Sequence, residues 1–411
     1  MIFLRLKRSR GGGRANEDAR ISQFDGQKTT GLSSEAGEIA FQYAQDFLTT
    51  GLELSPISVP LQKSAWRPQS NLFGGLPGFV ADSLPDGWGN LLLNRQLLRK
   101  GRHLVDIDPL QRLCWVGSQG MGALEYEPEE SFLPDFAASE IRLDTLAQNA
   151  EDILSDREAG NALDLLSSLN GSSGGARPKI VCLASDDKKT LFRGTEANDG
   201  ARPWLIKFRS IQDPPQSGAL EYAVSLLAKQ AGIAMPKTYL FASTKSSGWF
   251  GIERFDRTSR GKVHMATAAG LLHCDFRVPC LDYSTLMALT LRLCGSQDLP
   301  QMLKRAYFNF VIGNTDDHAK NFSFLMDADG KWRLSPAYDL MSTPGGEHMT
   351  SILGVGKNPG RRLFTDLGAK FDMDRQTVRI LLEEVDNALA GWPEIARNCG
   401  LRKPPEFLPI P

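Results

Sequence analysis

The 411-residue sequence has no excess of charge of either sign. Lysine and arginine together number 47, and aspartate and glutamate 48, so the formal net charge is −1 and the isoelectric point is about 6.6. A domain dedicated to nucleic acid is normally distinctly basic, and this balance therefore argues against direct nucleic-acid binding as the main function. The length is sufficient for two or three domains with a sizeable core.

Long apolar runs and paired cysteines are also missing. We find no apolar leader segment and no run of about 18 apolar residues, which argues against a secretory signal and a membrane-spanning helix. The six cysteines form no C-x-x-C pair and no zinc-type spacing. We therefore expect a cytoplasmic protein with reduced thiols and no membrane association.

One local charge excess occurs in "RLKRSRGGGR" (5–14), where basic residues surround three consecutive glycines. It has two interpretations, an exposed hairpin tip or a patch for an acidic partner or DNA backbone, and we favour the hairpin tip.

The chain divides into three parts by composition and pattern. Residues 1–130 alternate short strand-like runs with proline- and glycine-rich turns and end in an acidic, proline-flanked segment. Residues 131–257 begin with a helical stretch, continue through the glycine-rich segment "NGSSGGARPK" (170–179) and end in strands. From residue 258 on the pattern is mostly helical. We expect each part to be a subdomain or lobe.

The order of elements in the middle part is informative. The glycine-rich segment is followed by a predicted hairpin, a strand (203–210) that contains Lys207, a helix that contains Glu221, and two more strands. Lys207 lies between Ile206 and Phe208, so its side chain points away from theirs. It either faces solvent, as most lysines do, or contacts a ligand.

The glycine-rich segment also has two interpretations. Small residues let backbone N–H groups approach a phosphate closely, although the spacing of a Walker A loop is absent. Alternatively, a run of glycine and serine forms only a flexible turn.

The segment "GNTDDHAKNFSF" (313–324) carries the strongest chemical pattern. Asp316 and Asn321 have the D-x-x-x-x-N spacing of a protein-kinase catalytic loop, in which the aspartate accepts the substrate hydroxyl proton and the asparagine helps hold Mg²⁺. His318 is placed to contact the transferring phosphoryl group. Asp339, in "PAYDLMS", occupies the place of the kinase metal-binding aspartate. The alternative is an Asx-rich turn that caps the preceding helix; combined with Lys207 and Glu221, the pattern favours a kinase site.

Taken together, these motifs resemble the HipA-like serine/threonine kinases of bacterial toxin–antitoxin systems. The strings that carry the resemblance are "SSGGARPK", "LIKF", "IERFDR", "IGNTDDHAKNFSF" and "PAYDL", with looser matches upstream in "SPISVPL", "LPDGWGN" and "VGSQGMGAL". The resemblance implies an α+β, bilobal kinase-like fold related to lipid kinases. It also implies an extra N-terminal α/β subdomain (1–130), an N-lobe-like region (131–257) and a mostly helical catalytic C-lobe (258–411).

The resemblance also implies a role for each matching position. The catalytic residues would be Asp316 and His318, and the Mg²⁺ ligands Asn321 and Asp339. ATP phosphates would be bound by Gly174, Gly175, Lys179 and Lys207. The adenine would be held at a hinge by Glu253 and Phe255. Autophosphorylation would fall on Ser172, with Ser173 as a second candidate, and would inactivate the enzyme.

For partners, the resemblance implies a helix-turn-helix, HipB-like antitoxin, operator DNA bound mainly through that antitoxin, and a protein substrate such as an aminoacyl-tRNA synthetase. One stretch, "HMATAAGLLHCDF" (264–276), differs from the family pattern next to the nucleotide pocket. The sequence leaves two other functions open: a kinase that acts on a small molecule or lipid, and a pseudokinase that binds ATP without transferring phosphate.

Overall fold

The computed structural model describes residues 2–6, 17–23, 39–130, 141–157, 160–171, 174–198, 200–343 and 345–411. Most of the basic stretch 5–14 and both candidate phosphoserines, Ser172 and Ser173, lie outside these residues.

The N-terminal part is built on a four-stranded antiparallel sheet with the strand order β3-β2-β1-β4. The strands are β1 (Ile2–Leu6), β2 (Glu17–Gln23), β3 (Ile39–Tyr43) and β4 (Leu124–Glu127). In β4 the apolar Leu124 and Tyr126 are buried and the two glutamates are not, which is the two-residue alternation of a sheet with one face on a core. The accompanying helices are α1 (Gln45–Leu48), η1 (Leu72–Gly75), α2 (Gly78–Ala81), α3 (Gly87–Arg99), η2 (Leu104–Asp106) and α4 (Pro109–Val116).

The middle part contains a five-stranded antiparallel sheet with the order β6-β5-β7-β9-β8. Its strands are β5 (Lys179–Ser185), β6 (Leu191–Phe192), β7 (Ala201–Lys207), β8 (Thr238–Phe241) and β9 (Trp249–Glu253). Two helices, α5 (Leu143–Leu154) and α6 (Gly160–Leu169), share a core with apolar side chains of this sheet and with Trp88 of α3. The helix α7 (Ser217–Gln230) packs on β8 and β9. The predicted hairpin, strand, helix and two strands are thus confirmed.

The C-terminal part is mostly helical, as predicted. Its helices are α8 (Ala268–Leu272), α9 (Tyr283–Cys294), η3 (Ser296–Asp298), α10 (Leu299–Val311), η4 (Ala319–Asn321), α11 (Arg361–Lys370), α12 (Arg375–Leu389) and α13 (Trp392–Asn398). Its strands are β10 (Arg257–Thr258), β11 (Gly261–Lys262), β12 (His264–Thr267), β13 (Leu281–Asp282), β14 (Ser323–Met326), β15 (Trp332–Leu334) and β16 (Thr350–Ser351), of which β12, β14 and β15 form a three-stranded sheet.

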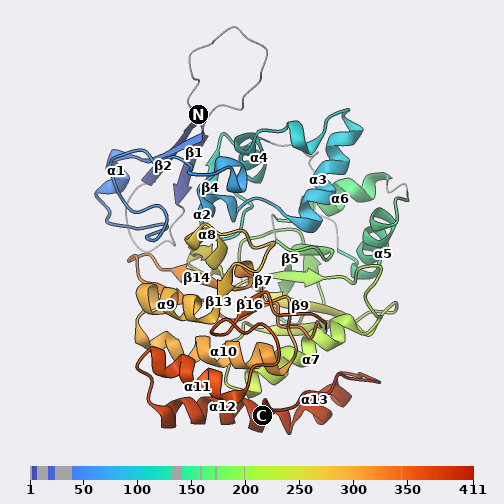
Figure 1. The fold of residues 1–411 in the computed structure, drawn as a ribbon. Helices are drawn as coiled ribbons and strands as arrows, with labels where there is room; N and C mark the ends of the chain where they lie inside the picture. Colours follow the sequence, from blue (N-terminus) through green and yellow to red (C-terminus); the bar gives the residue numbers. More distant parts are fainter. Residues whose placement is uncertain are drawn as a thin grey trace.

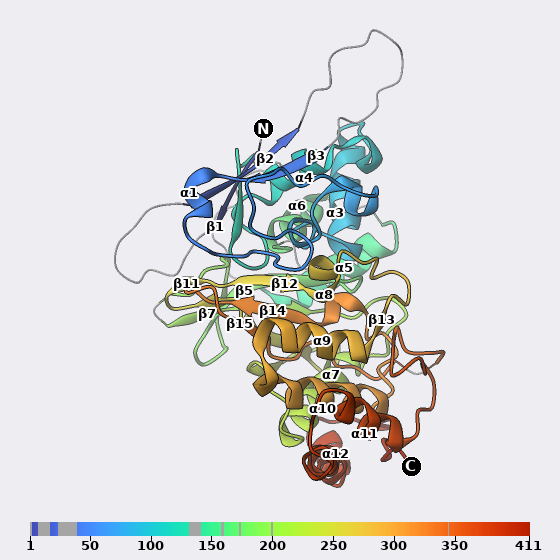
Figure 2. The same ribbon diagram turned by 60° about the vertical axis from the view of Figure 1, so that its left-hand side comes forward.

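The three parts follow one another along the molecule. Both views place the N-terminal sheet at one end, the five-stranded sheet in the middle, and α11 and α12 toward the opposite end (Figure 1, Figure 2). The central helix of the C-terminal part is α10, in which even Lys304, Arg305 and Asn309 are buried. None of the helices in the described part of the chain combines the length and apolar character that a membrane crossing requires.

A buried cluster of charges joins the N-terminal part to the segment that follows β9. Asp256 pairs with Arg254 and Arg257 at 2.7 Å each, and all three side chains are about 1% exposed. Both arginines also donate to the backbone carbonyl of Gly120, and the Asp256 carboxylate accepts from the Gly122 N–H at 2.7 Å. The loop at 117–122 therefore supplies hydrogen-bond partners that this buried cluster would otherwise lack.

Candidate active site

A cavity of about 790 Å³ lies where the N-terminal part, the glycine-rich segment and the segment 313–324 meet. This volume is within the range of small-molecule sites. Of the residues predicted to carry function, those that line it are Gly175, Lys179, Lys207, Asp316, His318 and Asp339. Gly174, Glu253, Phe255 and Asn321 are not among the described residues that line it.

Lys207 is the electrostatic centre of this cavity. Its neighbour Ile206 is buried in the core with α5 and α6, and the strand alternation turns Lys207 toward α7. Its Nζ lies 2.6 Å from Oε1 of Glu221 and 2.6 Å from Oδ1 of Asp339. Only 11% of the side chain is exposed, so the interpretation of Lys207 as a solvent-facing lysine is wrong.

The two carboxylates and the lysine fix one another's charge. Burial opposes charge on Lys207, but Asp339 and Glu221 raise the pKa of its ammonium above the ordinary value. Burial likewise opposes ionisation of Asp339, yet Lys207 and then Lys179 hold the pKa of this carboxyl well below its usual range. Asp339 also has a positive φ of 55°, a conformation that aspartate tolerates better than most residues.

The glycine-rich segment is held from both sides. The buried Lys179 donates to the carbonyl of Gly174, and burial together with the nearby charge of Lys207 lowers its pKa to about 8. Gly175 has a φ of 95°, and a side chain there would collide with Lys179, so glycine is required. The Gly175 N–H donates to the carboxylate of Asp86, which precedes α3.

Asp86 is a residue that the sequence did not single out, although its string "LPDGWGN" contributed to the family resemblance. Its second carboxylate oxygen lies 2.8 Å from Nζ of Lys320, in the segment 313–324. One side chain from the N-terminal part therefore connects the glycine-rich segment to the predicted catalytic segment. The acidic residue between a proline and a glycine was the available signal, but its partners are 89 and 234 residues away.

Asp317 anchors the segment 313–324 and was also missed. Its buried carboxylate accepts from the Tyr283 hydroxyl at 2.8 Å and from the Thr350 N–H at 3.1 Å, and it lies 3.0 Å from Nδ1 of His348. The adjacent Asp316 is exposed to the cavity. Asn321 donates its side-chain amide to the Asp316 carbonyl at 2.7 Å. This bond closes the loop that presents Asp316, but it does not cap the preceding helix α10, whose C-terminal cap at Ile312 is made by backbone hydrogen bonds.

Asp316 and Asp339 differ in their affinity for protons. Although Asp316 retains solvent-accessible surface, the protein atoms around its carboxyl partly desolvate it and raise its pKa, against the lowering effect of His318. His318 is half-buried, and its ring lies edge-on to Phe276 at 5.6 Å. Environments that separate the pKa values of two carboxyls allow one to exchange protons while the other stays ionised.

The oxygen atoms at this site suit Mg²⁺. Asp316 and Asp339 line the cavity with carboxylates and Asn314 with a side-chain amide, while Asn321 lies outside the lining and reaches the loop through its bond to the Asp316 carbonyl. Mg²⁺ prefers oxygen ligands and is commonly held by one or two carboxylates together with substrate phosphates. In the part of the chain that the structure describes, no group of three or more His, Cys, Asp or Glu residues could hold a metal by itself. The donor set therefore fits a metal that arrives with a phosphorylated ligand.

Comparison with models of known protein families assigns the chain to one of them. The family model of the HipA-like C-terminal domain matches residues 171–392, which is more than half of the chain, and that of the HipA N-terminal domain matches residues 23–127. The chain belongs to the HipA family.

Individual relatives are distant. Y4mE, named as a candidate kinase of Sinorhizobium fredii, is 26% identical over 395 residues, covering 90% of this chain and 82% of that protein. A second candidate kinase of that organism, Y4dM, is 28% identical over 173 residues, and the match spans only 42% of its length. The serine/threonine-protein kinase toxin HipA of Shewanella oneidensis is 24% identical over 342 residues, covering 76% of this chain and 71% of the toxin.

A solved structure shows the same fold. The Shewanella oneidensis MR-1 complex of HipA, HipB and operator DNA matches 98% of this chain and 92% of the solved chain, with a TM-score of 0.67 and 18% identity. The α+β, lobed kinase-like fold predicted from the sequence is thereby confirmed.

Two HipA-family positions predicted to hold adenine lie outside the cavity lining. The Glu253 N–H, on β9, donates to the Lys237 carbonyl at 2.9 Å, and the Glu253 carboxylate lies 3.8 Å from the Lys237 ammonium. The ring of Phe255 packs 5.7 Å from that of Tyr338, next to Asp339. Their role toward a nucleotide stays a prediction.

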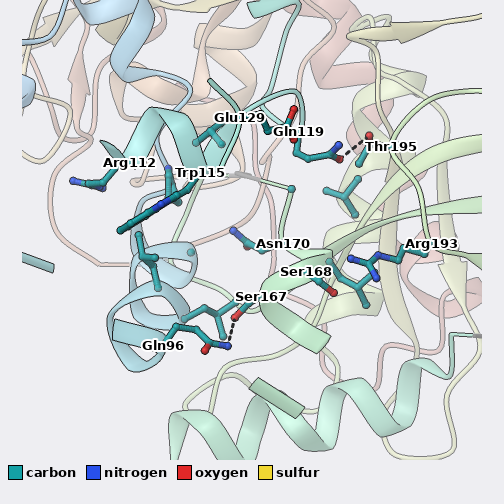
Figure 3. A pocket seen from close by; sticks show the side chains of 18 of the residues that line it. Gln96, Arg112, Trp115, Gln119, Glu129, Ser167, Ser168, Asn170, Arg193 and Thr195 are labelled. Atoms are coloured by element: carbon teal, nitrogen blue, oxygen red, sulfur yellow. Dashed lines mark hydrogen bonds between the residues drawn. The ribbon is translucent and has the colours of Figure 1, made fainter. Parts of the chain in front are cut away.

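A second cavity of about 710 Å³ lies beside the start of the glycine-rich segment. Figure 3 shows Gln96 of α3 turned toward Ser167 of α6, and Gln119 toward Thr195, with hydrogen bonds of 3.4 and 3.1 Å. Its carboxylates are Glu129, Glu130 and Glu196, and none of the predicted catalytic residues lines it. Asp316 and His318, the residues predicted to be catalytic, line only the first of these two cavities.

Proposed function

We propose that this protein is an ATP- and Mg²⁺-dependent serine/threonine protein kinase of HipA type. The observation that carries the proposal is the position of Lys207, 2.6 Å from both Glu221 and Asp339, in the cavity that also contains Asp316. A lysine fixed by a helical glutamate, a metal-binding aspartate and a separate catalytic aspartate are the parts that phosphoryl transfer from ATP requires.

The cationic side of the cavity would bind the phosphates. Lys207 and Lys179 line the cavity and supply positive charge. The Gly175 N–H donates to the Asp86 carboxylate, so a phosphate would have to displace Asp86 to accept from this backbone group. The Lys207 ammonium is already oriented by two carboxylates, so little reorganisation is needed when a phosphate replaces one of these contacts.

The two aspartates would divide the acid–base and charge roles. Asp316, with its raised pKa, accepts the proton of the attacking hydroxyl, while Asp339 stays ionised beside Lys207. His318, on the same loop, also lines the cavity and would contact the transferred group. Mg²⁺, held by Asp339 and Asn321 together with the phosphates, would neutralise charge that develops on the transferred group.

The biological role that we propose is that of a toxin that phosphorylates a component of translation. Support comes from the relative named as a kinase toxin and from the solved complex that contains HipA, HipB and operator DNA. We expect a HipB-like antitoxin as partner, with DNA bound mainly through it, because the net charge of this chain is only −1.

We propose in addition that residues 1–130, 131–257 and 258–411 act as an N-terminal subdomain, an N-lobe and a catalytic C-lobe. The three larger sheets support this division, since each falls within one of these ranges.

The enzyme would also inactivate itself by phosphorylating Ser172 or Ser173. Phosphate added there would bring negative charge against the phosphates of the nucleotide. The test is to incubate the purified protein with ATP and Mg²⁺, measure ATP consumption and map phosphorylated residues by mass spectrometry. Phosphate on Ser172 or Ser173 that is absent from an Asp316→Ala protein supports both proposals. If the protein consumes ATP but neither serine carries phosphate, the proposal of self-inactivation is contradicted. If it consumes no ATP with any acceptor tested, the proposed kinase activity is contradicted.

A further inference from the structure

Two thiols face each other beside the candidate active site. The Sγ atoms of Cys274 and Cys280 are 3.1 Å apart, and both residues carry free thiols. Cys280 is exposed and Cys274 is half-buried, whereas the other four cysteines are buried. The pair encloses the string "CDFRVPC", which begins in the stretch where the sequence departs from the HipA pattern.

The loop between the two cysteines forms part of the cavity wall. Phe276 and Arg277 both line the cavity. The Lys320 ammonium lies 4.3 Å from the centre of the Phe276 ring, and the His318 ring lies 5.6 Å from it. Any change that fixes or displaces this loop therefore acts on two residues of the catalytic segment.

We propose that Cys274 and Cys280 form a reversible disulfide, made by reaction with a peroxide, that fixes the 274–280 loop against the cavity. The sulfur atoms must approach by about 1 Å to reach the length of a disulfide bond. Residues 277–280 are all exposed, so this part of the loop can move without disturbing the core.

The exposed thiol reacts first. The Cys280 sulfur attacks the peroxide, the O–O bond breaks, and one water leaves with the formation of a sulfenic acid. The Cys274 sulfur then attacks the Cys280 sulfur, the S–O bond breaks, and the hydroxide leaves with the Cys274 proton as a second water. Two thiols and one hydrogen peroxide thus give one disulfide and two waters. Burial and then the neighbouring Cys280 raise the pKa of Cys274, which makes it the less reactive of the two thiols toward the peroxide.

The consequence for the cavity rests on the proposed nucleotide-binding function. The cavity already has the size of a ligand site with the loop in this position. A disulfide would hold Phe276 and Arg277 there and so reduce the conformational freedom lost when a nucleotide binds. We expect the oxidised protein to bind ATP-Mg²⁺ at least about fivefold more tightly than the reduced protein.

The first test counts thiols in the full-length protein. After treatment with hydrogen peroxide, the protein should lose two of its six thiols and two hydrogens of mass, and a thiol reductant should restore both. Cys280→Ser should show no such loss, and Cys294→Ser, at a buried position, should lose the same pair as the parent. A parent protein that keeps all six thiols, or that forms only sulfinic acid at Cys280, overturns the proposal.

The second test titrates ATP-Mg²⁺ into the reduced and oxidised forms by calorimetry. A tighter oxidised form, with no difference in Cys280→Ser, supports the coupling. Equal affinities of the two forms overturn the coupling to the cavity. If neither form binds ATP, the proposed kinase function fails, and the thiol count still decides the disulfide.

Discussion

Asp316 and Asp317 are neighbours in the sequence, but their carboxyls have different surroundings. Asp317 is buried and accepts hydrogen bonds from Tyr283 and the backbone of Thr350, so it holds the loop. Asp316 faces the cavity with a raised pKa. Removal of either should lower the proposed kinase activity, but for different reasons: loss of Asp317 would remove the anchor of the loop, whereas loss of Asp316 would remove the proposed proton acceptor.

Lys207→Met should weaken ATP-Mg²⁺ binding about tenfold to hundredfold, because it keeps the length of the side chain but removes a charge-assisted contact to phosphate. Isothermal calorimetry measures this directly. The matched control is Lys189→Met, on the exposed turn between β5 and β6, which should bind like the parent. Equal affinities of Lys207→Met and the parent would remove Lys207 from the phosphate site. A melting curve must accompany the measurement, since Glu221 and Asp339 lose their cation.

The strand β7 and the helix α7 show what local patterns can predict. The strand alternation in β7 predicted that the side chains of Lys207 and Ile206 point to different faces of the sheet. The helical spacing after residue 217 predicted that Glu221 lies on the helix that follows. The sequence therefore predicted both elements and their order. The segment 313–324 was singled out in the same way, from the spacing of Asp316 and Asn321, and its catalytic role stays a prediction.

Contacts between distant segments could not be predicted in this way. Asp86 meets Gly175 and Lys320, and Asp317 meets Tyr283 and His348, through pairings that depend on the packed fold. No periodicity or spacing within one element records such a pairing. A family motif can also indicate residues that the packed structure places elsewhere. Glu253 and Phe255 were predicted to hold adenine because they match the hinge motif, but the cavity in the described part of the chain is not lined by them.

The sheet of β12, β14 and β15 contains a histidine that should make stability depend on pH. His264 is buried, its Nε2 lies 3.0 Å from the Leu54 carbonyl, and burial lowers its pKa from 6.5 to about 4. As the pH falls from 6.5 to 4, the unfolded chain binds a proton that the folded protein does not. The free energy of unfolding should therefore fall by about 3 kcal/mol between pH 6.5 and 4, and His264 should cause no further loss below pH 4.

Chemical denaturation at a series of pH values, compared with His264→Gln, isolates this contribution. Glutamine keeps an N–H donor for the Leu54 carbonyl but does not titrate. The free energy of unfolding of the His264→Gln protein should therefore fall less between pH 6.5 and 4 than that of the parent. Parallel pH profiles for the two proteins would show that His264 is not the group responsible.

The N-terminal and catalytic parts of the molecule are joined through buried charges. Asp256 pairs with both Arg254 and Arg257 beside the loop at 117–122, and Asp86 reaches from the same N-terminal part to the glycine-rich segment. The site is therefore assembled from all three parts of the chain, and we expect the N-terminal part to be required for its geometry.

Asp256→Ala should destabilise the protein by about 3–5 kcal/mol, because it leaves two buried guanidinium groups without their counter-charge. Asp366→Ala is the matched control: Asp366 pairs with Arg362 on the exposed face of α11 at 3.5 Å, and its loss should cost less than about 0.5 kcal/mol. Urea denaturation measures both. Similar losses of unfolding free energy in the two variants would mean that the buried cluster contributes no more to stability than a surface ion pair.

The most direct test of the account is the rate of phosphate transfer from ATP by Asp316→Asn. This substitution keeps the size of the side chain but removes its capacity to accept a proton. Transfer to a protein acceptor or to the protein itself should fall at least about 100-fold, while the Kd for ATP-Mg²⁺ stays within about threefold of the parent value. Asp329→Asn, on the exposed turn between β14 and β15, should transfer phosphate like the parent. Undiminished transfer by Asp316→Asn would contradict the account.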